Sequence, residues 1–226
     1  MGQYFSPAII DSNRHYAIHL RGASKLTESG RLFNIGMYVV MNELERLTET
    51  KPVKYIHLGD DSSEYQKFDL CADSTDHLNT QQQMLKTVVY PRGVVDAEKL
   101  ESLHEDMLRF HIYNHTKREK VSLQDFYNQG HNGEDEDESP KRAFHPLALL
   151  CCTQAGGYCF EYLFAGTDLS NGGQWLNDDI SVSKNDFDGF TNITKTLRVT
   201  QSKESYQYLV QPRFSVNETF NDYAQF

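Results

Sequence analysis

The sequence predicts a single α+β domain over residues 1–226, in which a mixed or mostly antiparallel sheet of about seven to nine strands carries two main helices. Short apolar or alternating segments recur along the chain, whereas only two segments have the period of a long helix. Tyr and Phe each occur 13 times, and aromatic side chains are enriched in strands. A chain of this length can bury about 70% of its unfolded surface, so one core needs no disulfide or metal for stability.

The N-terminal part is expected to contain three strands and one helix. Residues 4–10 and 15–20 have the composition of strands, and the Asp-Ser-Asn sequence at 11–13 favours a tight reversal between them. Residues 35–47 predict a helix whose apolar positions cover most of its surface, which indicates burial on several sides. Residues 53–58 predict the next strand.

The centre of the chain is organised around a predicted β-hairpin at residues 110–123, with a polar turn at 116–119. Its first strand alternates side chains with a period of two. Before the hairpin, residues 87–90 predict a short strand, and Asp96 is expected to cap an amphipathic helix. The apolar face of that helix is formed by Leu100, Leu103 and Met107.

Residues 129–142 are expected to form a flexible acidic loop within the single domain. The segment combines Gly, His and Asn with an acidic run at 134–138 and a Ser-Pro pair, a composition that disfavours a packed core. Further strands are predicted after this loop. They cover residues 147–152, 158–164, 175–182, 194–200 and 206–210.

Charge and cysteine content restrict the class of protein. The net charge of −10 argues against a general nucleic-acid binder, which normally carries a basic surface. The four cysteines form no C-x-x-C pair. The opening residues lack the pattern of a secretory signal, and no stretch approaches the ~20 apolar residues of a membrane span. We therefore expect a reduced, cytoplasmic protein that binds neither membranes nor nucleic acid.

Gly59, Asp60 and Asp61 follow the strand predicted at 53–58, and His57 lies two residues before the glycine. Two carboxylates and an imidazole at the end of a strand are ligands for a divalent metal such as magnesium. The alternative is an ordinary strand-to-turn junction, because Gly and Asp are favoured there for conformational reasons alone.

His111, His115 and His145 form a second candidate site. The first two flank the hairpin turn, and His145 precedes Pro146 at the start of the strand predicted next. If these elements pair, the three imidazoles could bind a metal or act as an acid–base pair. Their spacing matches no standard zinc pattern, and a histidine beside a turn often only hydrogen-bonds the backbone.

Asp168 and Trp175 lie in or beside a glycine-rich loop, GTDLSNGGQW, that could contact a ligand. The loop lacks the residues of known phosphate-binding patterns, so an ordinary connection is the alternative. Cys151 and Cys152 fall in an apolar run, where burial raises the pKa of a thiol and makes it a poor nucleophile. The aromatic tail at 220–226 could pack on the core or dock on another chain.

Several short motifs together resemble those of a loose group of uncharacterised bacterial and phage proteins. The motifs are the opening MGQYF, GDD after a strand, YNHTKRE, HPLALL, and the W-x-x-D-x-I-x-V of residues 175–182. Proteins of that group begin with MGQYY and carry an NHTK-like hairpin and an HPLP-like strand. The resemblance spans most of the chain, and this sequence departs from it at the glycine-rich loop and in the acidic insert. It implies a bacterial, phage or mobile-element origin but no particular reaction.

Two functions are compatible with these observations. The first is a non-catalytic protein-binding factor that needs no cofactor and acts on a host protein or on a second copy of itself, because no complete catalytic constellation can be assembled from the sequence. The alternative is a metal-dependent hydrolase that uses Asp60 and Asp61 with His57, where a divalent metal would lower the pKa of a bound water.

Overall fold

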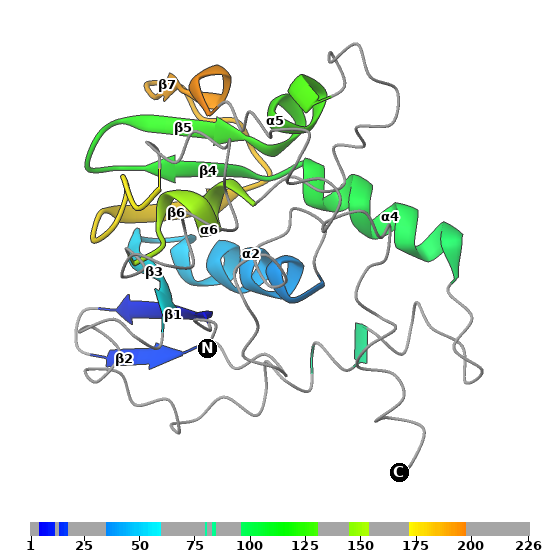
Figure 1. The fold of residues 1–226 in the computed structure, drawn as a ribbon, viewed down its shortest axis with the longest axis horizontal. Coiled ribbons are helices and arrows are strands. Elements are labelled where there is room, and N and C mark those ends of the chain that lie inside the picture. Colours follow the sequence, from blue (N-terminus) through cyan, green and yellow to red (C-terminus); the bar gives the residue numbers. More distant parts are fainter. Residues whose placement is uncertain are drawn as a thin grey trace, which may run out of the picture.

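The computed structural model describes residues 5–11, 14–17, 35–59, 80, 83, 84, 96–130, 145–153 and 172–197. These residues form one sheet in the order β2-β1-β3-β6-β4-β5-β7, with helices packed against it (Figure 1). The strands are β1 (Phe5–Asp11), β2 (Arg14–Ala17), β3 (Val53–Gly59), β4 (His111–Asn114), β5 (Glu119–Ser122), β6 (Asp179–Ser183) and β7 (Thr191–Asn192). The helices are α2 (Ile35–Thr48), α4 (Ala97–Leu108), α5 (Leu123–Gly130), α6 (Pro146–Leu150) and the 3₁₀ turn η4 (Thr194–Thr196).

The predicted α+β class and the mostly antiparallel sheet are confirmed. Every pair of neighbouring strands is antiparallel except β5 and β7. The predicted numbers of strands and helices are only approximately right. Strand β7 has just two residues, and the short helices α5 and α6 occur in addition to the two long helices α2 and α4. No helix in the described part of the chain is long and apolar enough to cross a membrane.

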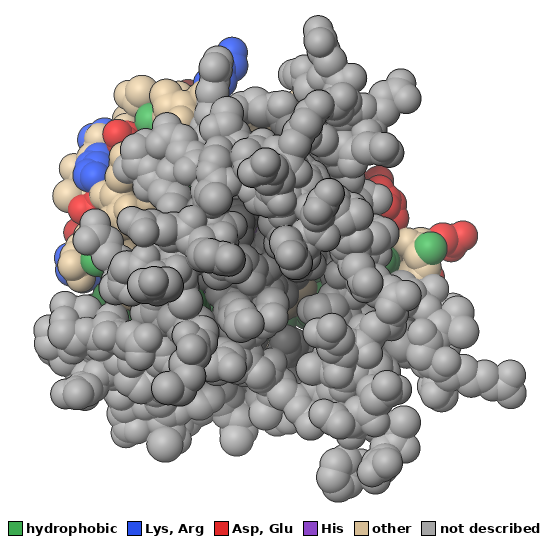
Figure 2. Space-filling view, viewed as in Figure 1, with side chains coloured by type: hydrophobic (Ala, Val, Ile, Leu, Met, Phe, Trp, Pro, Cys, Tyr) green, Lys and Arg blue, Asp and Glu red, His purple; other side chains and the backbone are tan. Residues whose placement is uncertain are grey.

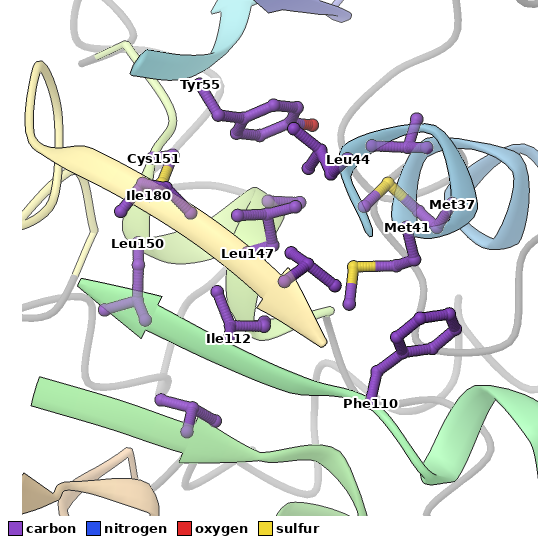
Figure 3. Close-up of a cluster of buried hydrophobic side chains, with 14 of the residues drawn as sticks. Met37, Met41, Leu44, Tyr55, Phe110, Ile112, Leu147, Leu150, Cys151 and Ile180 are labelled. Atoms are coloured by element: carbon purple, nitrogen blue, oxygen red, sulfur yellow. The ribbon is translucent and has the colours of Figure 1, made fainter. Parts of the chain in front are cut away.

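Helix α2 lies in the centre of the main core, as its apolar surface predicts. Figure 3 shows Met37, Met41 and Leu44 pointing toward side chains of the sheet and of α6, and all three are fully buried. At the end of the helix, the Thr48 hydroxyl donates to Leu44 O at 2.6 Å and accepts from Val182 N of β6 at 3.2 Å. These bonds fix the helix to the sheet.

In the centre of the chain, the capped helix and the β-hairpin are confirmed. The Asp96 carboxylate accepts a hydrogen bond from Lys99 N at 3.2 Å, which satisfies an orphan donor at the start of α4. Strands β4 and β5 pair from His111 opposite Ser122 to Asn114 opposite Glu119, so the hairpin turn falls at residues 115–118.

Strand β4 is buried on both faces. Ile112 belongs to the main core, whereas Tyr113 points to the opposite face and lies under residues 185–190. Both side chains are 0% exposed. The alternation of the sequence therefore separates two packed faces here, and not a buried face from a wet one.

The prediction of a strand at residues 147–152 is wrong. Residues Pro146–Leu150 form the short helix α6, and only Cys152 makes an isolated bridge, to His57. His145 is the N-cap residue of α6 and Pro146 occupies the first turn, where proline is well tolerated. A short apolar run has no helical period to distinguish it from a buried strand, which explains the error.

Two other predicted strands differ in part. The strand expected at 175–182 begins only at Asp179, because residues 172–177 form turns and Asn177 has a φ of 68°. The strand expected at 194–200 begins instead with η4, where the Asn192 side chain accepts hydrogen bonds from Thr194 N and Oγ1. Such local side-chain bonds compete with strand pairing.

The remaining predicted elements lie outside the described residues. They are the strands at 87–90, 158–164 and 206–210, the part of the acidic loop at 131–142, and the tail at 220–226.

Candidate functional site

His57 is built into the sheet near the end of β3. Its backbone N–H donates to Cys151 O at 2.9 Å, and its carbonyl accepts from Thr153 N at 3.0 Å. The segment that follows α6 is therefore attached to β3 beside this histidine. The His57 side chain is 0% exposed.

The His57 ring has one polar partner and one aromatic neighbour. Its Nδ1 lies 3.0 Å from the Tyr55 hydroxyl, and the ring stacks on Phe5 with centroids 5.8 Å apart. Its Nε2 is buried and has no hydrogen-bond partner among the described residues. A buried polar atom without a partner is uncommon in native proteins and calls for an explanation such as a bound ion or ligand.

His145 is also fully buried, at the start of α6. Its Nδ1 accepts a hydrogen bond from Leu147 N at 3.2 Å, so the imidazole caps the helix. Its Nε2 likewise has no partner within the part of the chain that the structure describes. We call His57 and His145 the imidazole pair.

Both members of the imidazole pair are neutral at physiological pH. Burial lowers the pKa of His57 to about 3. Burial lowers the pKa of His145 to about 3 as well, and the charge that His57 would carry acts in the same direction. The two rings are thus close enough to influence each other electrostatically, and neither Nε2 has a hydrogen-bond partner among the residues that the structure describes.

Burial makes the neighbouring thiols poor nucleophiles, which agrees with the environment that the sequence predicts. Burial raises the pKa of Cys151 well above its ordinary value, and raises that of Cys152 to about 12. The Cys152 thiol donates to Leu149 O at 3.1 Å. Both side chains therefore behave as small apolar groups in the core.

The imidazole pair could contribute to a metal site but does not complete one. A neutral imidazole is a common metal ligand. Among the described residues, however, no group of three or more His, Cys, Asp or Glu side chains could hold an ion. Asp60 and Asp61, the carboxylates that the sequence predicts for this site, lie outside the described residues.

The structure separates the three histidines of the second predicted site. His145 caps α6, while β4 pairs with β5 and β6. His115 Nε2 lies 2.7 Å from the Ser181 hydroxyl, and the His111 ring stacks on Tyr113. Since α6 replaces the strand that was expected to pair with the hairpin, the three imidazoles do not converge.

Trp175 is buried in the main core. Its side chain is 0% exposed, its indole N–H donates to Glu119 at 2.8 Å, and its backbone N–H donates to Leu150 O at 2.8 Å. It joins the hairpin to α6 through these two hydrogen bonds. Asp168, the other candidate of this loop, lies outside the described residues.

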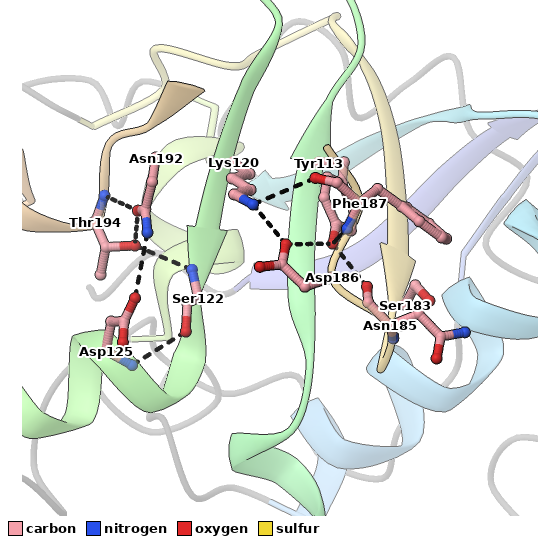
Figure 4. Close-up of polar contacts among 10 residues, drawn as sticks. All are labelled: Tyr113, Lys120, Ser122, Asp125, Ser183, Asn185, Asp186, Phe187, Asn192 and Thr194. Carbon is pink, nitrogen blue, oxygen red and sulfur yellow. Dashed lines mark hydrogen bonds and ion pairs between the residues drawn. The ribbon is translucent and has the colours of Figure 1, made fainter. Parts of the chain in front are cut away.

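A surface that the sequence did not indicate lies on the far face of β4. The Tyr113 hydroxyl donates to Asn185 O at 2.7 Å and accepts from Phe187 N at 2.9 Å, as Figure 4 shows. Lys120 forms an ion pair with Asp186 and donates to Phe187 O at 3.3 Å. The segment after β6 is therefore held on the sheet by its backbone and not only by its side chains.

Aromatic rings cover this region. The Tyr113 ring lies 5.2 Å from Phe187 and 5.0 Å from Phe190, and Phe190 also contacts His115 at 5.2 Å. The Arg118 guanidinium lies 4.3 Å from the Phe190 ring centroid. We call these five residues the aromatic surface. Phe187 is 46% exposed and is the one large exposed hydrophobic residue in the described part of the chain.

The charges around the aromatic surface largely compensate each other. Besides the Lys120–Asp186 pair, Lys117 lies 3.6 Å from Asp178. In Figure 2, Lys or Arg and Asp or Glu side chains alternate along the side of the molecule where Figure 1 shows the hairpin turn. Burial raises the pKa of Tyr113 to about 12, so its hydroxyl remains a hydrogen-bond donor at neutral pH.

Comparisons with family models, with curated proteins and with solved structures find no match to this chain. The functional inference therefore depends on the geometry of the imidazole pair and of the aromatic surface.

Proposed function

We propose that the protein is a non-catalytic factor that binds another protein through the aromatic surface. One observation carries this proposal: Phe187 exposes 46% of its surface at a position where its own backbone is fixed by Tyr113. Exposed aromatic residues that are held in place serve as anchors in protein interfaces.

Pre-organisation supports a binding role for this segment. The Tyr113 hydroxyl and Lys120 bond the backbone of residues 185–187 in the free protein. An anchor that is already ordered loses less conformational freedom on binding than a flexible one, so more of its contact energy appears as affinity.

The surrounding charges favour a protein partner over a nucleic acid. Lys120 and Lys117 are paired with carboxylates, and Arg118 lies over Phe190. The phosphates of a nucleic acid would have to displace these carboxylates in order to bind the two lysines. A protein partner with an apolar pocket and a polar rim could instead accept the exposed Phe187 ring and contact the paired charges around it. In line with the resemblance of the sequence, the partner would be a host protein of a bacterial, phage or mobile-element factor, or a second copy of the chain.

The test begins with a partner recovered from cells of the source organism and then purified, and with sedimentation of the protein alone to detect self-association. Phe187→Ala should weaken the measured affinity by at least about tenfold, the loss typical of an interface anchor. Phe187→Tyr keeps the ring and should stay within about threefold, and Glu98→Ala, at an exposed position of α4, should have no effect. Equal affinity of Phe187→Ala and wild type would refute the proposal.

A second candidate, a metal-dependent hydrolase, is favoured by one specific observation. The Nε2 of His57 is buried without a partner among the described residues, two positions before Gly59 and the Asp60-Asp61 pair that follows it in the sequence. His57 and the two aspartates would bind a divalent metal, whose role would be to activate a water.

Zinc binding tests this candidate directly. Zn²⁺ retained per chain after gel filtration should be stoichiometric in the wild type and lost in Asp60→Ala. Asp188→Ala removes an exposed carboxylate of the same type elsewhere and should retain the metal. Substoichiometric zinc in the wild type at saturating free metal would exclude the site.

A further inference from the structure

Two charged side chains at the aromatic surface have no partner of opposite charge among the described residues. They are Arg118 in the hairpin turn and Asp188 in the segment after β6, and both are exposed. The three lysines of the hairpin and of that segment are all paired, Lys117 with Asp178, Lys120 with Asp186 and Lys184 with Asp106. One cation and one anion are therefore left over beside the exposed ring of Phe187.

The Arg118 side chain is held in place on the aromatic surface. Its backbone has a φ of 58°, and its guanidinium lies 4.3 Å from the centroid of the Phe190 ring. At Gly189 a Cβ would lie only 2.9 Å from this guanidinium, so the absence of a side chain there leaves room for it. Attraction to a ring leaves the N–H groups of a guanidinium available for a carboxylate, which arginine can bind through two parallel hydrogen bonds.

The Asp188 carboxylate lies next to the anchor residue Phe187. The Tyr113 hydroxyl accepts from Phe187 N at 2.9 Å, so the backbone that presents both side chains is fixed to β4. Asp188 and Arg118 belong to neighbouring parts of the surface, because Gly189 follows Asp188 and contacts the guanidinium. They form no ion pair with each other within the chain. The carboxylate is thus an exposed acceptor at the rim of the aromatic surface.

The combination of an exposed ring, an unpaired cation and an unpaired anion is self-complementary. When two copies of one surface face each other across a two-fold axis, each residue of one copy meets the counterpart residue of the other in both directions. Arg118 of each copy can then face Asp188 of the other, and the two Phe187 rings are removed from water between these pairs. A different protein would have to supply a base, an acid and an apolar contact in the same arrangement.

We propose that the aromatic surface binds a second copy of the chain in a two-fold dimer, in which Arg118 of each copy pairs with Asp188 of the other around the two Phe187 rings. This inference rests on the proposed binding function and names the partner. The net charge of −10 repels two copies, but exposed charges farther apart than about 8 Å are largely screened at physiological ionic strength. Pairs in direct contact across the interface are screened much less.

Sedimentation equilibrium of the full chain at physiological salt, from micromolar to near-millimolar concentration, tests the dimer. The wild type should associate reversibly, and Phe187→Ala should weaken the dimer by at least about tenfold, because both copies lose the anchor. Two charge reversals at exposed positions elsewhere serve as matched controls and should leave the dimer unchanged. They are Glu98→Arg on α4 and Lys195→Asp on η4.

Charge reversals at the surface itself test the pairing. Arg118→Asp places two carboxylates opposite each other in the dimer, and Asp188→Arg places two guanidinium groups opposite each other. Each variant alone should therefore dimerise at least about tenfold more weakly than the wild type. An equimolar mixture of the two variants restores opposite charges at both contacts, and its heterodimer should have an affinity within about threefold of the wild-type dimer. Aspartate is also among the residues that best tolerate a positive φ such as that of residue 118.

The mixture distinguishes pairing between chains from any contact within one chain, because neither variant contains both partners of an Arg–Asp pair. A mixture that associates no better than the separate variants would overturn the inference. A dimer that Phe187→Ala and both reversals leave unchanged would also overturn it, since the contact would then lie on another surface. A wild type that stays monomeric at all concentrations would overturn the dimer alone, because the Phe187→Ala measurement with a partner recovered from cells tests the proposed function separately.

Discussion

Removal of the Tyr113 hydroxyl offers a sharp test of how the aromatic surface is held. In Tyr113→Phe the ring and its contacts with Phe187 and Phe190 remain. The substitution removes the donor to Asn185 O and the acceptor of Phe187 N. The change is therefore limited to two hydrogen bonds on the backbone of one segment.

The expected loss of stability follows from those two bonds. A typical intramolecular hydrogen bond contributes about 0.5–1.5 kcal/mol net, so the pair contributes about 1–3 kcal/mol. Asn185 and Phe187 are exposed, so water can hydrate the backbone groups that lose their partner. We therefore expect the unfolding free energy to fall by about 2 kcal/mol, below the upper end of this range. For a domain of this size that corresponds to a melting temperature lower by about 4–8 °C.

Urea unfolding at neutral pH measures this effect, and Tyr38→Phe is the matched control. The Tyr38 hydroxyl donates to Asp106 at 2.6 Å, away from the aromatic surface. Both variants should lose stability, but only Tyr113→Phe should also increase amide exchange at Phe187 and weaken binding of a partner. A Tyr113→Phe protein with unchanged unfolding free energy and unchanged exchange would show that the segment is held by other contacts.

Three further predictions concern the core, the cap and the buried imidazole. Met41→Ala should cost about 2–5 kcal/mol of unfolding free energy, because the side chain is fully buried in the main core; a loss below 1 kcal/mol would contradict this packing. Asp96→Ala should cost about 1 kcal/mol and Asp96→Asn clearly less, since Asn can still accept from Lys99 N. Burial lowers the pKa of His57 to about 3 in the folded protein, against about 6.5 for an unperturbed histidine, so between these pH values the unfolded chain binds a proton that the folded one does not. Stability should therefore fall as pH drops from 6.5 toward 3, and His57→Gln should make this slope shallower by up to about 1.4 kcal/mol per pH unit in metal-free protein; identical slopes would contradict the neutral, buried imidazole.

The parts of the fold that the sequence predicted correctly have strong local signals. Helix α2 has an apolar surface and α4 has an N-cap aspartate, while the hairpin has alternation on both sides of a polar turn. These signals act within a few residues of the chain. Long-range packing did not have to be known in order to find them.

The failures occurred where long-range contacts decide the structure. His145 is not among the usual N-cap residues, so α6 had only Pro146 as a sequence signal of its first turn. The aromatic surface depends on a contact between Tyr113 and residues more than 70 positions later. Gly189 is the one sequence signal in this segment. Its φ is 81°, and a Cβ at this position would lie 2.9 Å from the Arg118 guanidinium. Glycine in that position indicates a close turn but not what the turn covers.

The sequence analysis named both His57 and His145 but placed them in two different candidate sites. The environment of the two side chains can be compared with that of other buried polar groups in the core. The buried hydroxyls of Thr48 and Tyr113 and the indole of Trp175 all have hydrogen-bond partners. The fold thus satisfies buried polar groups in positions that require contacts across long stretches of chain. Among the described residues, the Nε2 atoms of His57 and His145 have no hydrogen-bond partner, and the same is true of His111 Nδ1, so this feature is shared by imidazoles outside the pair. A bound ion or water molecule is one explanation of such atoms, and comparing zinc binding of the wild type with that of His57→Gln would test it at His57.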